Sequence, residues 1–387
     1  MKEGWDLVKL GSLCDIQNGF AFDSKLFNND GKGLPLIRIR DIKRGYSETF
    51  TTEECDNAYV VKDGDYLIGM DGEFNIGQWK SENALLNQRV CKLLPSSKIL
   101  PRFIYYYIPK ALKDIEDKTA YATVKHLSSK QIKEIHIPNI SLPEQQRIVD
   151  ILDREFAKID ALKANAEKSL QAAKDLFQAT LKKELEPKEG WKVSSMGEVS
   201  SIARGGSPRP IKAFITEDAD GINWIKIGDT EVGGKYISST KEKIRKEGMR
   251  SSRFVEAGDF LLSNSMSFGR PYILKTNGCI HDGWLVIKKY EDTFTQDFLY
   301  YLLLSPSVVK QFEEGARGST VRNLNTDIVS AVRVSYPSTL QEQEEIVARV
   351  EEQNYKCKAL QDNYQKTLTL CDDLKQSLLR KAFNGEL

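Results

Sequence analysis

Arginine and lysine side chains gather in a few short segments, and their type and spacing are the clearest chemical signal in the chain. Arginine binds phosphate, or the O6 and N7 edge of guanine, through paired N–H donors. The segments therefore predict DNA contact, although any single member also fits a solvated surface charge. The candidate DNA-binding residues are Arg38, Arg40, Lys43, Arg44, Arg204, Arg209, Lys241, Lys243, Arg245, Lys246, Arg250, Arg253, Arg270, Arg317, Thr320 and Arg322.

The sequence contains none of the common catalytic motifs. It has no GxxxxGK[ST] loop, no HExxH pair, no Asn/Asp-Pro-Pro-Tyr/Phe methyltransferase motif and no convincing GxGxxG after a strand. The histidines His126, His136 and His281 lack the spacing of a catalytic triad or a metal site. His281, beside Asp282, could serve as a base, but we interpret it as a turn residue. We therefore expect a non-catalytic protein that binds neither cofactor nor metal.

Composition limits the class of protein. The 387 residues are 40% apolar, enough for two cores, and no long apolar run or signal peptide is present, so we expect a soluble, cytoplasmic protein away from membranes. The six cysteines form no CxxC pair, which favours reduced thiols. The net charge is only +1, whereas a protein that grips DNA alone is usually more basic. Either the chain does not bind DNA, or a basic partner supplies the phosphate contacts.

The chain is an internal repeat. Residues 2–5 (KEGW) recur as residues 188–191, and the later part of each copy leads into a long helical pattern. Further matches join residues 34–41 to 222–229, 64–67 to 258–261, 103–106 to 298–301, 123–127 to 320–324 and 142–149 to 340–347. The spacing between copies drifts through the mixed regions and is constant along the helices. A duplicated unit predicts a pseudo-two-fold object, which suits a target in two parts.

The two helical patterns run over residues 142–185 and 340–383, without an interior glycine or proline beyond the first turn. Apolar residues recur at alternating spacings of three and four, as in a coiled coil. We expect the helices to pack together antiparallel; the alternative is that each lies on its own domain. The predicted seam positions are Val149, Leu152, Phe156, Ile159, Lys163, Ala166, Leu170, Ala173 and Phe177, and Val347, Val350, Asn354, Cys357, Gln361, Tyr364, Leu368, Cys371, Lys375 and Leu378.

The mixed regions predict an α+β fold. Residues 36–39 and 225–227 alternate like half-buried strands, and glycine turns precede strands at 66–68 and 260–262. Residues 103–108 and 298–304 predict short buried helices. The expected organisation is a first mixed domain at 1–141, a helix at 142–186, a second mixed domain at 187–339 and a second helix at 340–387.

The chain resembles the specificity subunit of type I restriction–modification systems. The resemblance covers nearly the whole sequence and is carried by the Gly-Trp starts, by Gly-Asp-Tyr/Phe-Leu at 64–67 and 258–261, by Leu-Pro-Glu-Gln-Gln at 142–146, and by Lys-Ala-Phe-Asn-Gly at 381–385. The second copy departs at Gln341, where the first has Pro143.

The resemblance implies two domains that each read half of a split double-stranded DNA target, and helices that set the gap. It also implies two modification (methyltransferase) subunits and restriction subunits as partners, which would use S-adenosylmethionine and ATP. Such partners would supply the phosphate contacts that a near-neutral chain lacks. Two alternatives stay open: a two-headed scaffold without DNA readout, and the specificity module of a related enzyme whose nuclease and methylase are fused.

Overall fold

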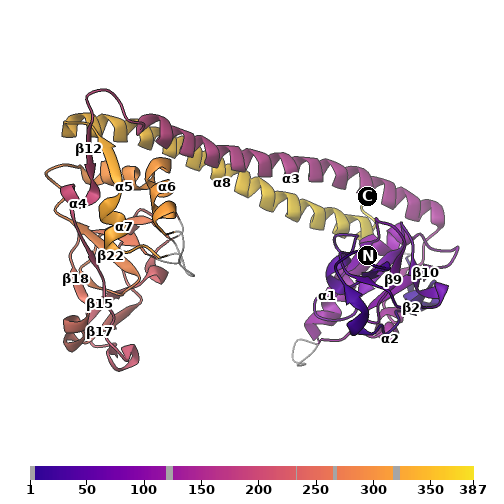
Figure 1. Ribbon diagram of the computed structural model, residues 1–387. Coiled ribbons are helices and arrows are strands. Elements are labelled where there is room, and N and C mark those ends of the chain that lie inside the picture. The colour runs from indigo at the N-terminus through magenta and orange to yellow at the C-terminus, as the bar shows by residue number, and fades with distance from the viewer. Residues whose placement is uncertain (1–4, 119–124, 232, 265–267, 317–322) are drawn as a thin grey trace. The chain divides into compact units, whose positions relative to one another are not determined.

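The computed structural model describes residues 5–118, 125–231, 233–264, 268–316 and 323–387 (Figure 1). Two compact units divide the chain: unit 1 comprises Met1–Asn165 and Thr367–Leu387, and unit 2 comprises Ala166–Lys366. Each unit holds one mixed region and a part of each of two long helices, α3 (Leu142–Glu184) and α8 (Leu340–Asn384). No helix within the described residues is long and apolar enough to cross a membrane.

Unit 1 contains two sheets that lie one behind the other. The sheet nearer the long helices has the strand order β2-β10-β7-β8 and the farther sheet has the order β3-β5-β4-β9-β6. A two-stranded ladder, β1-β11, joins the start of the region to its end. The elements are β1 (Leu7–Lys9), β2 (Cys14–Asn18), β3 (Phe27–Asn28), β4 (Leu34–Ile37), η3 (Ile39–Asp41), β5 (Phe50–Thr51), β6 (Val60–Val61), β7 (Tyr66–Gly69), β8 (Ile76–Gln78), β9 (Ala84–Leu86), β10 (Val90–Pro95), α1 (Pro101–Lys118), α2 (Ser129–Lys133) and β11 (His136–Pro138).

Unit 2 repeats this plan. Its near sheet has the order β13-β22-β19-β20-β16, its far sheet has the order β14-β17-β15-β21-β18, and β12-β23 is the matching two-stranded ladder. The elements are β12 (Lys192–Ser195), α4 (Met196–Val199), β13 (Ser201–Arg204), β14 (Ile215–Thr216), β15 (Ile222–Ile225), η6 (Ile227–Asp229), β16 (Tyr236–Ile237), β17 (Glu242–Ile244), η7 (Lys246–Ser251), β18 (Arg253–Val255), β19 (Phe260–Ser263), β20 (Pro271–Leu274), β21 (Gly278–Ile280), β22 (Trp284–Lys288), α5 (Gln296–Leu304), α6 (Pro306–Gly315), α7 (Thr326–Ala331) and β23 (Arg333–Tyr336).

The central strands of the near sheet of unit 2, β19, β20 and β22, are almost wholly buried and mostly apolar, so this part of the sheet is covered on both faces. In β19, Phe260 and Leu262 belong to the core beneath the helices, whereas Leu261 belongs to the core between the two sheets. In β22, Leu285 belongs to the core beneath the helices and Trp284 to the core between the sheets, because successive side chains of a strand point to opposite faces. The far sheet therefore lies away from the helices, and its other face carries a small apolar cluster that includes Trp224 and Cys279.

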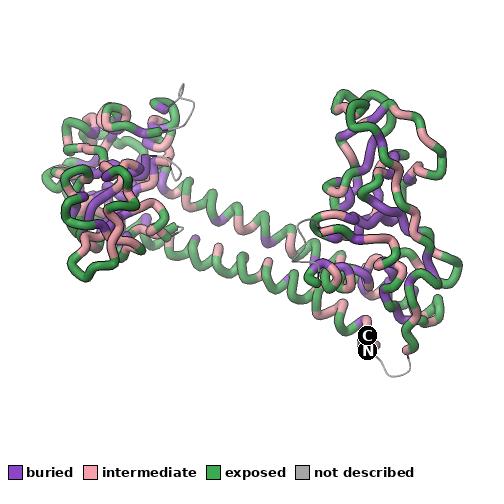
Figure 2. Tube along the Cα trace, turned by 90° about the horizontal axis from the view of Figure 1, so that it is seen from below, coloured by how far each residue is buried: buried purple, intermediate pink, exposed green. Residues whose placement is uncertain are grey.

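The predicted seam of the long helices is confirmed. In unit 1, Lys163 bonds Asp372 at 2.7 Å and Lys375 bonds Asp160, so the two helices pack antiparallel, as expected. In unit 2, Arg349 pairs with Glu184 at 2.9 Å. Every apolar seam position predicted from the sequence is buried or half-buried, including Cys357 and Cys371, and Figure 2 shows buried positions recurring along both helices between exposed ones.

Matching buried glutamines, Gln145 and Gln343, tie the start of each long helix to earlier segments of its own unit. Gln145 is 1% exposed, accepts a hydrogen bond from the Leu100 N–H at 2.8 Å and donates to the Lys98 and Ile140 carbonyls. Gln343 holds the segment before α5 in the same way, accepting from the Thr295 N–H at 2.9 Å and donating to a carbonyl at 2.8 Å. Each buried amide thus satisfies two or more backbone groups of the segments that it contacts.

Four predicted elements have different bounds in the structure. The strands expected at 36–39 and 225–227 end at Ile37 and Ile225, and 3-10 turns follow, because an aspartate four residues after the strand end accepts the N–H of the residue that follows the strand. The helix expected at 103–108 extends over Pro101–Lys118, since Leu112 continues its buried face past Pro109. The helix expected at 298–304 begins two residues earlier, capped by the Thr295 side chain.

Candidate nucleic-acid interface

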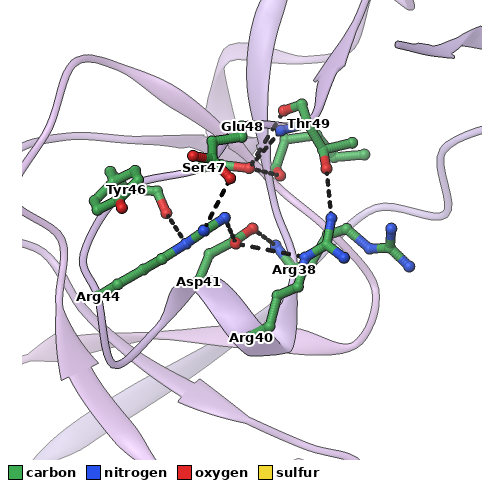
Figure 3. A network of polar contacts seen from close by, with 9 residues as sticks. Arg38, Arg40, Asp41, Arg44, Tyr46, Ser47, Glu48 and Thr49 are labelled. Atoms are coloured by element: carbon green, nitrogen blue, oxygen red, sulfur yellow. Dashed lines mark hydrogen bonds and ion pairs between the residues drawn. The ribbon is translucent and has the colours of Figure 1, made fainter. Parts of the chain in front are cut away.

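In unit 1 the basic residues surround a buried carboxylate at the end of β4. Asp41 is fully buried, and its Oδ2 accepts the Arg38 N–H at 2.8 Å (Figure 3). Its Oδ1 accepts Arg44 Nη2 at 2.5 Å, and Arg44 also donates to Glu48 and to the Tyr46 carbonyl. Arg44 is therefore bound within the fold, and its charge compensates Asp41 rather than facing solvent.

The neighbouring cations are more available. Arg40 Nη2 donates to Thr49 Oγ1 at 3.1 Å, yet 60% of its side chain is exposed. Lys43 pairs with Glu73 at 2.6 Å, with both side chains largely exposed. Arg38 is exposed, and no carboxylate among the described residues pairs with its guanidinium. Arg38 and Arg40 are thus the members of this group best placed to contact a phosphate or a base edge.

Unit 2 repeats the turn with different chemistry. Asp229 accepts the Lys226 N–H at 2.8 Å and the Lys241 N–H at 3.2 Å, so it joins the end of β15 to the segment before β17. Lys226 takes the place of Arg38, and its Nζ bonds Glu242 at 2.7 Å. Gly228 stands where unit 1 has Arg40. The turn is therefore shared while its exposed groups differ between the two units.

The densest basic segment of unit 2 lies on the far sheet and the turn that follows it. The side chains of Lys241 and Lys243 donate to backbone carbonyls, at 3.1 and 3.2 Å. Lys246 pairs with Asp220 at 2.8 Å, which lowers the pKa of Asp220 and raises that of Lys246. Arg245 and Arg250 are exposed, with no side-chain partner in the described part of the chain. These two guanidinium groups are free to take an external acceptor.

A second group converges on Asp282, at the end of β21. Arg204 donates from Nε to the Asp282 carbonyl at 3.0 Å, and Arg253 donates to the Arg204 carbonyl at 2.7 Å. Arg209 lies 3.6 Å from the Asp282 carboxylate and is 82% exposed. The Ser207 hydroxyl donates to the same carboxylate at 2.7 Å and holds the pKa of Asp282 below its usual value, which keeps it an acceptor.

This group borders a cleft of about 1030 Å³ in unit 2. Its walls combine apolar and charged side chains: Ser207, Pro208, Arg209, Pro210, Ile211, Lys212, Ile215, Trp224, Lys226, Glu242, His281 and Asp282. His281 accepts the Gly283 N–H on Nδ1 at 2.6 Å, and burial lowers its pKa, so the ring is neutral near pH 7. This is the turn role expected for His281. Carboxylates beside guanidinium and ammonium groups offer both acceptors and donors to base edges.

The remaining candidates do not join these groups. Arg270 is half-buried in the turn before β20, on the near sheet. Arg317, Thr320 and Arg322 lie outside the described residues. Sequence reasoning missed Lys212 and Lys226, which line the cleft. The repeat contains a signal for Lys226, because Ile-Arg-Ile-Arg-Asp in the first copy aligns with Ile-Lys-Ile-Gly-Asp in the second.

The described residues contain no cluster of three or more His, Cys, Asp or Glu side chains that could hold a metal ion. Most of the basic residues described above lie on the far sheets and their turns, while Arg204 ends β13 of the near sheet. A sequence pattern for the type I restriction modification DNA specificity domain matches residues 2–172 and again residues 188–369. The chain belongs to this family.

Members of the type I specificity family align with nearly all of the chain. The type I restriction enzyme EcoBI specificity subunit of Escherichia coli is 31% identical, and the alignment covers 100% of this chain and 86% of that protein. The EcoDI specificity subunit of the same species is 23% identical over 99% of this chain and 88% of its own length. The predicted resemblance is confirmed.

Solved structures show the same fold. A chain from a study of complex assembly and conformational transition of the type I restriction–modification system matches with a TM-score of 0.75 and 20% identity, covering 100% of this chain and 99% of that one. The HsdS subunit from Thermoanaerobacter tengcongensis matches with a TM-score of 0.53 and 18% identity, covering 100% and 98%. Two repeated α+β regions joined by long paired helices are thus the architecture of the type I specificity family.

Proposed function

We propose that this type I specificity protein reads a double-stranded DNA target made of two separated half-sites. Residues 1–141 and 187–339 would be the two target recognition domains, and the helices at 142–186 and 340–387 would set the gap between the half-sites. The observation that supports this most directly is the repeated far sheet with its Asp-centred turn, formed at Asp41 and Asp229 and surrounded by different cations. One scaffold with two sets of exposed groups suits two different half-sites.

The chain would read DNA without catalysing a reaction. Its sequence carries no motif for methyl transfer, cleavage or ATP hydrolysis. Two modification (methyltransferase) subunits and the restriction subunits would supply those activities, with S-adenosylmethionine and ATP bound to them. A net charge of +1 suits this division, since the partners would provide much of the phosphate contact.

The outer side of α8 in unit 1 is a surface that such a partner could cover. Leu370 and Leu374 are 55% and 48% exposed, one turn apart, and they line a groove with Asp373, Ser377 and Arg380. The seam residues lie on a different side of α8: Cys371 is buried, and Leu378 packs against the apolar core of unit 1. Exposed leucines at helical spacing suit docking of an amphipathic helix. We propose this groove as a contact for a modification subunit.

Co-expression with a type I modification subunit tests the proposal. Methylated adenines mapped across the host genome should define one asymmetric, interrupted site, while the purified chain alone should neither methylate, cleave nor hydrolyse ATP. A contiguous palindromic site would contradict reading by two different domains. No site-specific methylation with a subunit that binds the chain would favour the scaffold alternative.

Replacement of Arg245, Lys246 and Arg250 by Ala tests the far sheet of unit 2. If all three contact phosphates, the slope of log affinity against log salt for the assembled complex should flatten by about three. The matched control replaces Lys192, Lys289 and Lys310, which are exposed lysines of the same unit on elements other than the far sheet. An equal loss of slope in both variants would show that net charge, rather than this surface, determines the affinity.

A further inference from the structure

The junction between each mixed region and its long helix uses the same three positions of the repeat. In unit 1 these are Tyr105 and Tyr106 on α1 and Asp153 on α3; in unit 2 they are Tyr300 and Tyr301 on α5 and Glu351 on α8. Each tyrosine pair packs edge to face, with ring centroids 5.4 and 5.1 Å apart. In both units one cation lies over the tyrosine rings and bonds the acid on the long helix.

In unit 2 the cation is Lys235. Its Nζ lies 2.6 Å from Asp297 Oδ1 on α5 and 3.1 Å from Glu351 Oε1 on α8. It also lies 5.1 and 5.2 Å from the ring centroids of Tyr300 and Tyr301. Only 16% of its side chain is exposed. We name Lys235, Asp297, Tyr300, Tyr301 and Glu351 the Lys235 cluster.

In unit 1 the cation comes from the helix itself. Arg102 on α1 bonds Asp153 through Nε and Nη2, at 2.9 and 2.7 Å, and lies over Tyr105 and Tyr106. The matching position in unit 2 is Asp297, an acid, so the charge is reversed there and the cation must come from elsewhere. Lys235 supplies it from a loop of the β region.

This origin gives Lys235 a mechanical role that Arg102 does not share. Lys235 directly precedes the edge strand β16, and its carbonyl accepts the Ile273 N–H of β20 at 2.9 Å. Its ammonium reaches α5 and α8. A single residue thus ties the edge of the near sheet to the long helix. Burial alone would lower its pKa, but the two carboxylates raise the pKa above the usual lysine value, so the charge persists.

We propose that Lys235 is a positioning residue that fixes the angle of the second recognition domain on α8 and thereby determines which gap between the half-sites is accepted. This inference rests on the proposed reading of an interrupted target. Two neighbouring gap lengths differ by about 3.4 Å along the DNA axis. A domain that can tilt on its helix can reach half-sites at either of two neighbouring gap lengths. A domain that several charged contacts hold at one angle can reach half-sites at only one gap length.

The experiment uses the chain co-expressed with its modification subunit and a plasmid library that carries both half-sites at gaps from two shorter to two longer than the wild-type gap. Lys235→Met should raise methylation at gaps altered by one base pair, relative to the wild-type gap, by about tenfold, equivalent to about 1.4 kcal/mol. Lys235→Arg should restore the wild-type ratio. Lys275→Met is the matched control, because Lys275 stacks on Tyr236 at 4.6 Å without an ion pair to α8.

The ratio between gaps separates positioning from stability, since a merely destabilised domain loses methylation equally at every gap. If Lys235→Met gives no methylation at any gap, the ratio between gaps is measured with Glu351→Gln instead. This change removes only the ion pair between Lys235 and α8, and it does so at a side chain that is 47% exposed. An unchanged ratio in the variant that retains activity would overturn the inference. A wild-type chain that directs no interrupted-site methylation would contradict the proposed function instead.

Discussion

Insertion of four residues into both long helices should widen the gap between the half-sites by one or two base pairs. The two insertions must face each other, and the unit 1 ion pairs fix where. Lys163 bonds Asp372, so Asn165 lies level with Leu370, and an insertion after Asn165 is matched by one after Thr369, which leaves the groove between Leu370 and Arg380 intact. Each insertion adds a little more than one turn, which the seam can absorb as a local change in supercoil.

The magnitude follows from helix geometry. Four residues at 1.5 Å each lengthen a helix by about 6 Å. Base pairs repeat every ~3.4 Å, so this length corresponds to about 1.8 base pairs. The half-site sequences should not change, because both far sheets with their turns are untouched.

Mapping of methylated adenines across the genome measures the gap directly. An insertion after Asn165 alone is the control, since it displaces Lys163 and Asp160 from their partners on α8 and should reduce methylation without defining a new gap. An unchanged gap with full methylation in the double insertion would refute the role of the helices as the ruler. Changed half-site bases would refute the separation of reading from spacing.

Three further predictions concern stability and reactivity. Gln145→Leu and Gln343→Leu should each lower the free energy of unfolding by about 3 kcal/mol, because buried backbone groups lose their partners, and urea denaturation measures this. Lys375→Met should change it by less than about 1 kcal/mol, since the lost ion pair is partly exposed and Met fits the seam; a larger loss in the same assay would show that the pair specifies register. At pH 8, iodoacetamide should modify half-exposed Cys55 well before Cys91, which is fully buried and whose pKa burial raises to about 12; mass spectrometry that found equal rates would contradict the packing of β10.

The long helices could be predicted in detail because their pattern is local. Period and spacing alone placed Lys163 and Lys375 on the seam, and the structure pairs each with an aspartate of the other helix. The repeat extended this prediction from one unit to the other, since the spacing between copies is constant along the helices.

The two-layer sheets could not be predicted, because their strands are short and pair with distant residues. β4 has four residues and pairs parallel with β9, which lies more than forty positions along the chain. Which basic residues are paired with a carboxylate could not be predicted for a similar reason. Nothing local distinguishes Arg44, which neutralises a buried aspartate, from Arg38, which remains exposed. Which cations are free depends on the carboxylates that folding brings beside them.

Residues from the beginning and the end of the described chain pack in one core of unit 1. In unit 1, Trp5 and Leu387 pack against the same apolar cluster as Phe383 and Val149. In unit 2 the corresponding Leu185 and Trp191 also share a core, but there the backbone runs on from one to the other. We therefore expect the cores to form even when the chain is opened after Pro187. A gene opened at that point, with its old ends joined by a short linker, would encode the same cores in a circularly permuted order.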